Sequence, residues 1–217
     1  MSSNNTVLEI SNSRKNILSI LEKHQGYDVS DYAEFSMHEI DAMITNNQLD
    51  MLVQHKENNK KTYVKYVLNS NSISKSVKTP TIDEYIDDLY NIEQLLTKQD
   101  TLIVIIGEDP NDTVLNYLKH LYNTTGVYVV VQTVKRLQFN ILEHQLVPRM
   151  YILNDEELKT MRKTYNIGES ERLATKLPEI SRFDPQAVAM CMRPGNVGVF
   201  DRKSVTAIHY DYFRICV

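Results

Sequence analysis

The sequence predicts an α+β protein built from two domains, and three observations lead to that fold class. The chain has 217 residues, 42% hydrophobic and 24% charged, which suits one large or two small packed domains. Two β-branched runs enclose a helical segment between residues 101 and 134, which indicates a βαβ unit. After Pro148 the pattern changes to short segments punctuated by proline and glycine. We therefore expect domains over residues 1–142 and 143–217.

An amphipathic helix and a hairpin are expected at the start of the first domain. Apolar residues recur on one helical face, at Ile10, Ile17, Leu18 and Leu21. With Gly26 as the closing residue, this spacing predicts a helix over residues 12–24. A second helix is expected from Asp31. Residues 51–56 and 62–68 favour strands, and the polar residues between them suit a hairpin connection.

The rest of the first domain is expected to hold its core. Residues 69–78 are poor in large apolar side chains and predict a loop. Thr81 and Glu84 have the spacing of a capping box, which predicts a helix start there, with an apolar face at Ile82, Ile86, Leu89 and Leu96. Residues 101–106 predict a strand buried on both faces, followed by a helix over 114–121, Gly126 as its end, and a second buried strand over 127–134.

The second domain is expected to be a small mixed unit. Residues 151–153 form a short β-favouring run, and Asn154 precedes three acidic residues in the manner of a helix N-cap. Asp184 and Pro185 give a cap and first-turn proline ahead of a helix over 186–192. A turn at 193–196 leads to a strand over 197–200, and residues 206–217 are β-rich.

Composition excludes several function classes. The formal charge of −4 and an isoelectric point near 5.9 provide no cationic field for autonomous tight DNA binding. Cys191 and Cys216 cannot form a four-thiolate zinc site and are interpreted as buried thiols of a reducing compartment. No signal peptide and no window of about 20 apolar residues is present. We expect a soluble intracellular protein without a membrane partner.

No pattern of a cofactor or metal site stands out. The six glycines are scattered, which excludes the phosphate-binding fingerprints. The turn at residues 107–112 carries three carboxylates, which suit a helix start and would repel phosphate. The six histidines form no pair at helical spacing. We therefore expect no cofactor and no bound metal.

Two acid-x-Lys triplets are candidates for a nuclease site, because nucleases use such a triplet with a further acid to hold a divalent ion. Glu157-Leu158-Lys159 falls on the acidic helix start, and Asp201-Arg202-Lys203 falls in an expected turn. Tyr63, Lys65 and Tyr66 are candidates for a base-stacking surface, but alternation along a strand explains them, with Tyr63 and Lys65 on one side. No catalytic residue is predicted, which favours an assembly or binding role.

The second half carries an ordered set of short motifs. These are Glu143-His144-Gln145-Leu146-Val147-Pro148, Leu177-Pro178-Glu179-Ile180, Asp184-Pro185, Arg193-Pro194-Gly195 and Tyr210-Asp211-Tyr212-Phe213-Arg214-Ile215. In this order and spacing they resemble the fifth subunit of eukaryotic nuclear RNA polymerases and the archaeal counterpart of that subunit. The resemblance implies that residues 143–217 form the assembly domain, a small mixed α/β module that packs on the largest polymerase subunit.

The first half resembles the jaw domain of the eukaryotic members. The similarity rests on Arg14-Lys15, Gly26-Tyr27-x-Val29 and Leu102-Ile103-Val104. It implies a restriction-nuclease-like α/β core without catalysis, placed beside downstream DNA. Of the family's DNA-proximal jaw element only Pro110 matches, so weak DNA contact is expected.

The resemblance also implies partner-binding residues, on the positions that match the family motifs. They are His144, Leu146, Val147, Pro148, Leu177, Pro178, Ile180, Asp184, Pro185, Arg193, Gly195, Tyr210 and Arg214. For Arg214, alternation along the terminal strand leaves two expectations open: a cation in solvent, or a guanidinium paired with a carboxylate or carbonyls.

Departures from the family pattern are present as well. Glu179 stands where the family motif has arginine, which reverses a charge, and residues 192–202 hold fewer cations than the family pattern. These departures suggest that the partner subunit has diverged as well, as in a polymerase encoded by a large DNA virus. The expected location is the nucleus for a cellular protein, and a virion or cytoplasmic viral factory for a viral one.

The implied function is that of a non-catalytic structural subunit of a DNA-directed RNA polymerase. Two alternatives remain: a DNA-processing protein with a degenerate nuclease core, and a free transcription-factor adaptor. Magnesium-dependent nicking activity would identify the first, and absence from the purified polymerase would identify the second.

Overall fold

The chain divides into two compact units, Met1–Asn140 and Ile141–Val217, which we call the N-terminal and C-terminal units. The computed structural model describes residues 2–69, 72–203, 206 and 208–217. Each unit has its own main sheet, so the chain has the α+β character that the sequence predicts.

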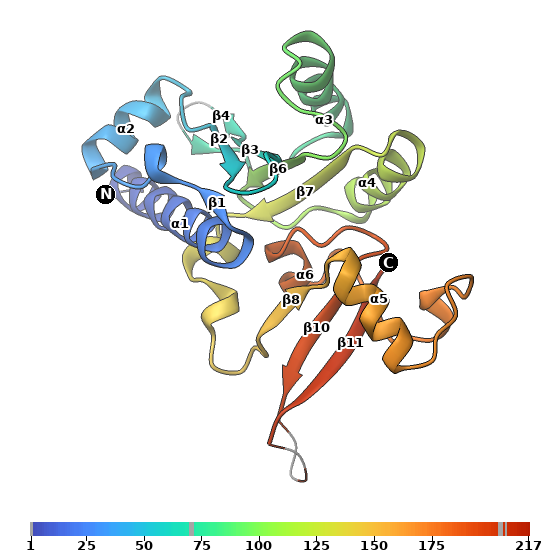
Figure 1. Ribbon diagram of the computed structural model, residues 1–217. Coiled ribbons are helices and arrows are strands. Elements are labelled where there is room, and N and C mark those ends of the chain that lie inside the picture. Colours follow the sequence, from blue (N-terminus) through green and yellow to red (C-terminus); the bar gives the residue numbers. More distant parts are fainter. Residues whose placement is uncertain (1, 70–71, 204–205, 207) are drawn as a thin grey trace. The chain divides into compact units, whose positions relative to one another are not determined.

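The N-terminal unit is built on a five-stranded mixed sheet with the strand order β1-β2-β3-β6-β7 (Figure 1). Strands β1, β2 and β3 pair antiparallel, whereas β3, β6 and β7 pair parallel. The strands are β1 (Tyr27–Asp28), β2 (Met51–His55), β3 (Lys61–Tyr66), β4 (Leu68–Asn69), β5 (Ser72–Ile73), β6 (Thr101–Ile106) and β7 (Tyr128–Thr133). The helices are α1 (Ser2–Gln25), η1 (Ser30–Tyr32), α2 (Met37–Thr45), α3 (Thr79–Ile86), η2 (Asp87–Ile92), α4 (Asp112–Thr125) and η3 (Arg136–Gln138).

The centre of this sheet confirms the predicted βαβ unit. Every residue of β6 and β7 is buried, as expected of parallel strands covered on both faces. Helix α4 connects them: the Asn111 side chain accepts a hydrogen bond from the Val114 N–H at 3.0 Å, and Gly126 ends the helix with φ +78. Strands β2 and β3 confirm the predicted hairpin.

The opening helix α1 is confirmed, but it begins at Ser2 rather than near residue 12. Ile10 is 1% exposed, so the buried face of the helix extends upstream of the expected start. Gly26 closes the helix as predicted, with φ +75 and its N–H on the Glu22 carbonyl at 3.2 Å. No helix of the described ranges is long and apolar enough to cross a membrane.

Two predicted helix starts are wrong. From Asp31 the chain makes only the short helix η1, and α2 begins at Met37 after Ser36, whose side chain and that of Glu39 form a capping box. The expected capping box at Thr81 does not form, because α3 already begins at Thr79 and places Thr81 inside the helix. There Pro80 occupies the first turn, where its missing N–H costs nothing.

Part of the predicted loop at residues 69–78 is a β ladder. Leu68 and Asn69 pair antiparallel with Ile73 and Ser72, and residues 70 and 71 lie outside the described ranges. The Ser74 N–H donates to the Val67 carbonyl at 2.7 Å, which holds the base of this short ladder.

The C-terminal unit has a four-stranded sheet with the order β8-β10-β11-β9. Strands β8, β10 and β11 pair antiparallel, and β9 joins β11 in parallel. The strands are β8 (Met150–Ile152), β9 (Glu179–Ile180), β10 (Val197–Arg202) and β11 (Tyr210–Cys216). The helices are η4 (Ile141–Glu143), α5 (Asp155–Thr164), η5 (Leu173–Thr175) and α6 (Pro185–Ala189).

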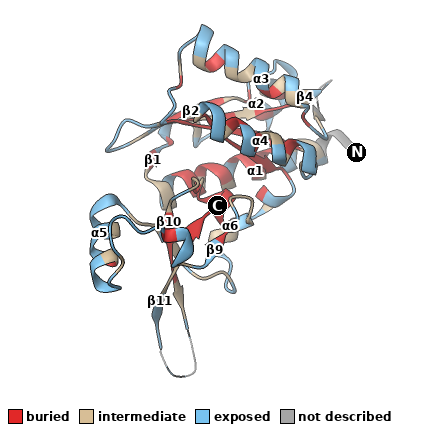
Figure 2. Cartoon of the chain, turned by 90° about the vertical axis from the view of Figure 1, so that its right-hand side faces the viewer, coloured by how far each residue is buried: buried red, intermediate tan, exposed pale blue. Residues whose placement is uncertain are grey.

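The two faces of this sheet carry separate apolar clusters. On one face Phe200, Ile180 and Cys216 pack with Ala187 of α6 and with Met192. On the other face Val197 and Ile215 pack with residues of α5 and η5, including Met161 and Leu173. Figure 2 shows α5 mostly exposed, which agrees with its single buried residue, Met161. The sheet is therefore the middle layer of a small unit.

Both predicted helices of the C-terminal unit are confirmed. Asn154 caps α5 within a capping box with Glu157, and Asp184 caps α6 by accepting from the Gln186 N–H at 2.9 Å. Helix α6 ends at Ala189, earlier than expected. The interpretation of residues 201–203 as a turn is wrong for Asp201 and Arg202, which extend β10 opposite Asp211 and Tyr210.

Candidate partner-docking site

The turn at residues 144–148 exposes the first group of implied partner-binding residues. The His144 ring accepts a hydrogen bond from the Leu146 N–H through Nδ1 at 3.2 Å, and the His144 carbonyl accepts from the Val147 N–H at 3.0 Å. These bonds hold Leu146 at 86% exposure. The Pro148 carbonyl accepts from the Gln186 side chain at 2.7 Å, which ties the turn to α6. The turn is thus fixed, with an apolar side chain in solvent.

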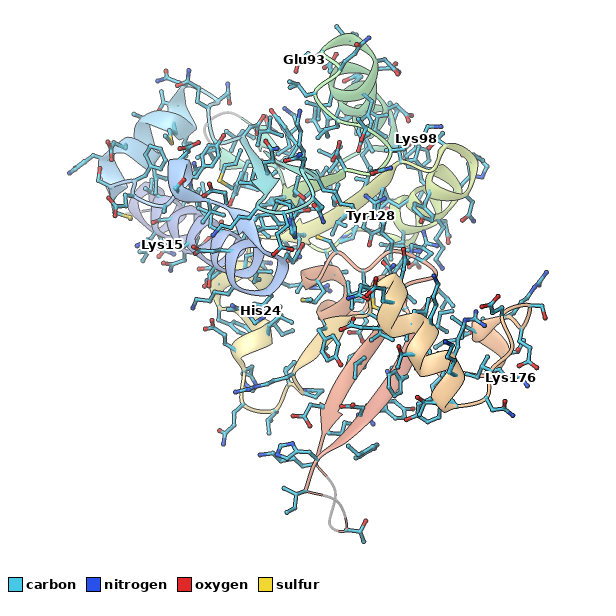
Figure 3. All side chains as sticks on the ribbon, in the orientation of Figure 1. Lys15, His24, Glu93, Lys98, Tyr128 and Lys176 are labelled. Atoms are coloured by element: carbon cyan, nitrogen blue, oxygen red, sulfur yellow. The ribbon has the colours of Figure 1, made fainter. Side chains whose placement is uncertain are left out.

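A second group of these residues holds the C-terminal end of β11. The Pro178 carbonyl accepts from the Ile215 N–H at 2.9 Å, and the Ile180 carbonyl accepts from the Val217 N–H at 3.0 Å. Leu177 packs into the cluster around Val197, whereas Ile180 is buried in the other cluster. This part of the Leu-Pro-x-Ile motif therefore acts within the unit. Figure 3 labels the neighbouring Lys176, whose ammonium lies 3.3 Å from the Glu171 carboxylate.

The turn at residues 193–196 belongs to the same group. The Asn196 side chain accepts from the Arg193 N–H at 2.9 Å, and the Gly195 N–H donates to the Cys216 carbonyl at 2.9 Å. Gly195 has φ +90, a left-handed conformation in which a side chain would be strained. An added Cβ would meet no atom within 4 Å, so available space does not require glycine at this position. The left-handed backbone conformation of the turn is what requires it.

Asp184 and Pro185 shape the start of α6. The Asp184 carboxylate is engaged as the N-cap, and Pro185 occupies the first turn with its ring exposed. Since α6 carries three buried residues, this cap fixes the helix against the sheet. Asp184 therefore has a structural use, while Pro185 remains accessible.

Tyr210 and Arg214 lie on one face of β11 with Tyr212 between them. The register places Arg202 opposite Tyr210 and Gly198 opposite Arg214. The Arg202 guanidinium lies 4.3 Å from the Tyr212 ring centroid, and that of Arg214 lies 5.4 Å from it. Two cations thus stack on one ring, each within the distance of a cation–π interaction.

Arg214 is half-buried on the sheet, beside two aromatic rings. Its guanidinium also lies 5.9 Å from the Phe200 ring, and its Nε is buried without a hydrogen-bond partner. Across the described ranges no ion pair joins Arg214 to a carboxylate. The described residues show no ion pair at Arg214, and its half-buried guanidinium packs on aromatic rings.

The acid of each acid-x-Lys triplet contacts another group of the chain. The Glu157 carboxylate accepts from the Asn154 N–H at 2.9 Å in the capping box. The Asp201 carboxylate lies 2.9 Å from the His209 ring, and Arg202 lies on the opposite face of the strand. No group of three possible metal ligands occurs within the described part of the chain.

In the N-terminal unit, Pro110 lies between β6 and α4, where the neighbouring Asp109 forms an ion pair with Arg136 at 3.0 Å. Sequence reasoning missed another polar group on this unit. Asp50, just before β2, lies 2.9 Å from the Lys65 ammonium on β3. The register of the hairpin places Asp50 opposite Lys65, which is a signal for this ion pair. The search for a nuclease motif passed over it, because that motif needs an acid two residues before the lysine and position 63 is tyrosine.

Comparison with known proteins agrees with the motifs of the C-terminal unit. The family described as "RNA polymerase Rpb5, C-terminal domain" matches residues 139–216. The "DNA-directed RNA polymerase subunit Rpo5" of Thermococcus kodakarensis is 42% identical over 80 residues, which cover 37% of this chain and 92% of the relative. The subunit of the same name from Pyrococcus abyssi is 39% identical over 80 residues, with the same coverage of both chains. That of Archaeoglobus fulgidus is 32% identical over 81 residues, 37% of this chain and 100% of the relative.

These matches include nearly the full length of each archaeal relative, at identities of 32–42%. The chain therefore belongs to the Rpb5/Rpo5 family of DNA-directed RNA polymerase subunits.

Proposed function

We propose that this chain is a non-catalytic structural subunit of a multisubunit DNA-directed RNA polymerase, which docks on the largest subunit through its C-terminal unit. One observation carries the proposal. The 80 residues that match the Thermococcus kodakarensis protein cover 92% of that chain, which is named a polymerase subunit. A segment of about 80 residues is therefore long enough to make up almost a whole subunit. Residues 141–217 form a compact unit of similar length in this chain.

The accessible motif residues are the best candidates for docking. Leu146, Pro185 and Tyr210 are exposed, and the large side chains of Leu146 and Tyr210 would gain free energy on burial. The remaining motif residues hold turns, the β11 end and the α6 cap, and they support docking by fixing the surface. Arg214 belongs to both groups, since it is half-buried on the aromatic rings.

For the N-terminal unit we propose the jaw role beside downstream DNA, with weak contact. Its mixed sheet and crossover helix suit a nuclease-like core, and the pairing of Arg136 with Asp109 beside Pro110 reduces the positive charge available to phosphate. The chain acts where its polymerase is assembled: the nucleus for a cellular enzyme, a virion or cytoplasmic factory for a viral one.

Affinity capture of the tagged full chain from its native cells, followed by mass spectrometry, tests the proposal. We expect the two largest polymerase subunits among the captured proteins. Leu146→Asp should reduce their recovery by tenfold or more, because it places a charge in the docking interface. Ile92→Asp is the matched control, since Ile92 is 73% exposed on the N-terminal unit. Capture without polymerase subunits would favour the free adaptor.

A fragment of residues 143–217 should also be recovered with the largest subunit on co-expression, whereas residues 1–142 should not. The opposite pattern would reverse the assignment of the docking unit. A magnesium-dependent nicking assay on the purified chain tests the DNA-processing alternative. That alternative would be supported if the wild type nicks DNA and Asp50→Asn does not.

A further inference from the structure

The far part of the β10–β11 hairpin carries aromatic and cationic side chains on one face of the sheet. The register pairs Arg202 with Tyr210, and alternate residues of a strand share a face. Four residues therefore line one side, and we call them the arginine–tyrosine row: Arg202, Tyr210, Tyr212 and Arg214. Phe200, which pairs with Tyr212, lies on the same face and packs with α6. The row thus continues this face beyond the packed core.

The row is accessible, and its side chains are held in place. Tyr210 is 40% exposed and the other three residues are half-buried, and Figure 2 shows this part of β11 in pale blue and tan. The guanidiniums of Arg202 and Arg214 lie 4.3 Å and 5.4 Å from the Tyr212 ring centroid. The Tyr210 ring meets the same ring edge-on, with the centroids 6.4 Å apart. A partner would therefore meet side chains that stacking has already ordered, which lowers the entropy cost of binding.

The two positive charges of the row are not balanced by a nearby acid. Among the residues that the structure describes, no carboxylate forms an ion pair with Arg202 or Arg214. The Nε of Arg214 is also buried without a hydrogen-bond acceptor. Two guanidiniums beside one ring repel each other, and a buried donor without an acceptor is unfavourable. Carboxylates suit such a surface, because a guanidinium presents a planar fork of donors that matches a carboxylate.

A polypeptide fits the row better than a nucleic acid. Asp201 and Asp211 stand directly opposite one another on the other face of the same strands, so a chain of phosphates that extends past the hairpin would meet two carboxylates. The formal charge of −4 provides no attraction for a polyanion either. Tyrosine and arginine are enriched where protein partners bind most tightly, and the exposed Tyr210 ring offers apolar area to a peptide.

We propose that the arginine–tyrosine row binds an acidic segment of the largest polymerase subunit. Carboxylates of that segment pair with the guanidiniums of Arg202 and Arg214, and its apolar side chains pack on the tyrosine rings. The inference rests on the proposed docking function and adds the chemistry of the partner. It also adds Arg202 and Tyr212, which are not among the partner-binding residues that the family motifs imply.

Zero-length crosslinking tests whether carboxylates occupy the row. Arg202→Lys and Arg214→Lys each keep the positive charge and supply an amine, which a carbodiimide joins only to a carboxylate in direct contact. The tagged full chain of each variant is captured with its polymerase and treated, and the joined peptides are identified by mass spectrometry. We expect a bond from position 202 or 214 to an aspartate or glutamate of the largest subunit. Assembled polymerase without such a bond at either position would overturn the proposal.

Loss of the two charges should weaken docking. The full chain with Arg202→Gln and Arg214→Gln should bind the largest subunit about tenfold more weakly than wild type. Lys163→Gln is the matched control, because it removes an exposed cation of α5 in the same unit and should leave recovery unchanged. Circular dichroism checks the folding of each variant. If the double variant does not fold, Arg202→Gln alone is compared, with a loss of about threefold expected.

Other results separate this inference from the docking function itself. A wild-type chain that captures no polymerase subunit would overturn docking as a whole. Normal recovery by the folded arginine variants would leave docking intact and reject the acidic partner segment. An oligothymidine strand that binds the purified wild type but not the double variant would assign the row to nucleic acid, which would also overturn the proposal.

Discussion

The Arg202 guanidinium lies 4.3 Å from the centroid of the Tyr212 ring, and the two residues are diagonal neighbours on the paired strands β10 and β11. Arg214 approaches the same ring, so Tyr212 separates two cations that would otherwise repel one another. On the opposite face of these strands Asp201 stands directly across from Asp211. The far end of this hairpin is thus cationic and aromatic on one face and acidic on the other.

Arg214 should contribute more to assembly than to stability. Arg214→Met keeps an apolar stem on the rings and removes a buried Nε that lacks a hydrogen-bond partner, so the free energy of unfolding should change by less than about 1 kcal/mol. Arg214→Ala also loses the packing and should cost about 1–2 kcal/mol. Urea unfolding measures both, with Lys75→Ala in an exposed segment as the control.

Capture of the polymerase by the same variants separates the two roles. Arg214→Met should fold normally and still recover less of the largest subunit than wild type, because a docking role needs the cation. Equal recovery by wild type and Arg214→Met would limit Arg214 to packing within the unit.

Gly198 should be essential for packing beneath the arginine pair. An added Cβ would lie 3.1 Å from the Met192 methyl, 3.2 Å from the Phe200 ring and 3.5 Å from the Met150 methyl. The methionine ends can move, but the ring is held in the core, so Gly198→Ala should destabilise the chain by about 1–3 kcal/mol in urea. Gly168→Ala is the matched control, because its new Cβ meets only the flexible Glu171 side chain, at 3.6 Å. Equal stability of the two variants would contradict this packing argument.

Buried strands and strong caps were predictable from the sequence. The run at residues 101–106 and the caps Asn154 and Asp184 depend on local residue chemistry, and the structure has them. The wrong helix start at Thr81 has a local cause as well. Pro80 favours the first turn of a helix, so α3 begins at Thr79 and Thr81 cannot act as its N-cap. The capping-box spacing of Ser36 and Glu39 is also visible in the sequence, and it marks the true start of α2 better than Asp31 does.

Contacts between distant segments could not be predicted in the same way. The stacking of Arg202 on Tyr212 depends on the pairing register of β10 and β11, which the spacing of residues within one strand does not determine. The Asp50–Lys65 pair was missed because the expected motif needed an acid at position 63. The sequence motifs identified the C-terminal unit, but they did not separate residues that fix a turn from residues that face solvent.

Cys216 should react slowly with alkylating agents at neutral pH. It is 1% exposed, its thiol donates to the Met192 carbonyl at 3.3 Å, and burial raises its pKa to about 11. Because the thiolate is the reactive form, iodoacetamide at pH 8 should label the half-buried Cys191 well before Cys216. Peptide mass spectrometry over time measures both sites, and the rates should converge in urea. Cys216 labelling as fast as Cys191 in the folded chain would contradict the expectation.

The free energy of unfolding should fall above pH 10, because the buried Tyr66 phenol resists ionisation in the folded state. Burial raises the pKa of this phenol to about 12, against the opposing effects of Ser13 and Arg14. The Ser13 hydroxyl donates to the Ile10 carbonyl at 2.8 Å, which leaves Tyr66 as the donor in the 3.2 Å bond between the two hydroxyls. The neutral phenol therefore fits the folded state, and ionisation in the unfolded state begins near pH 10.

Since the folded pKa exceeds the unfolded one, the contribution of Tyr66 is fully present below pH 10 and is lost between pH 10 and about 12. The loss should reach about 1.4 kcal/mol at pH 11, from the two-unit separation of the pKa values. Urea unfolding of wild type and Tyr66→Phe at pH 8 and pH 11 measures it: the wild type should lose about 1.4 kcal/mol more than the variant over this interval. Tyr210→Phe, which alters an exposed side chain on the other unit, should follow the wild type. Parallel losses in wild type and Tyr66→Phe would show that the Tyr66 phenol does not control stability in this range.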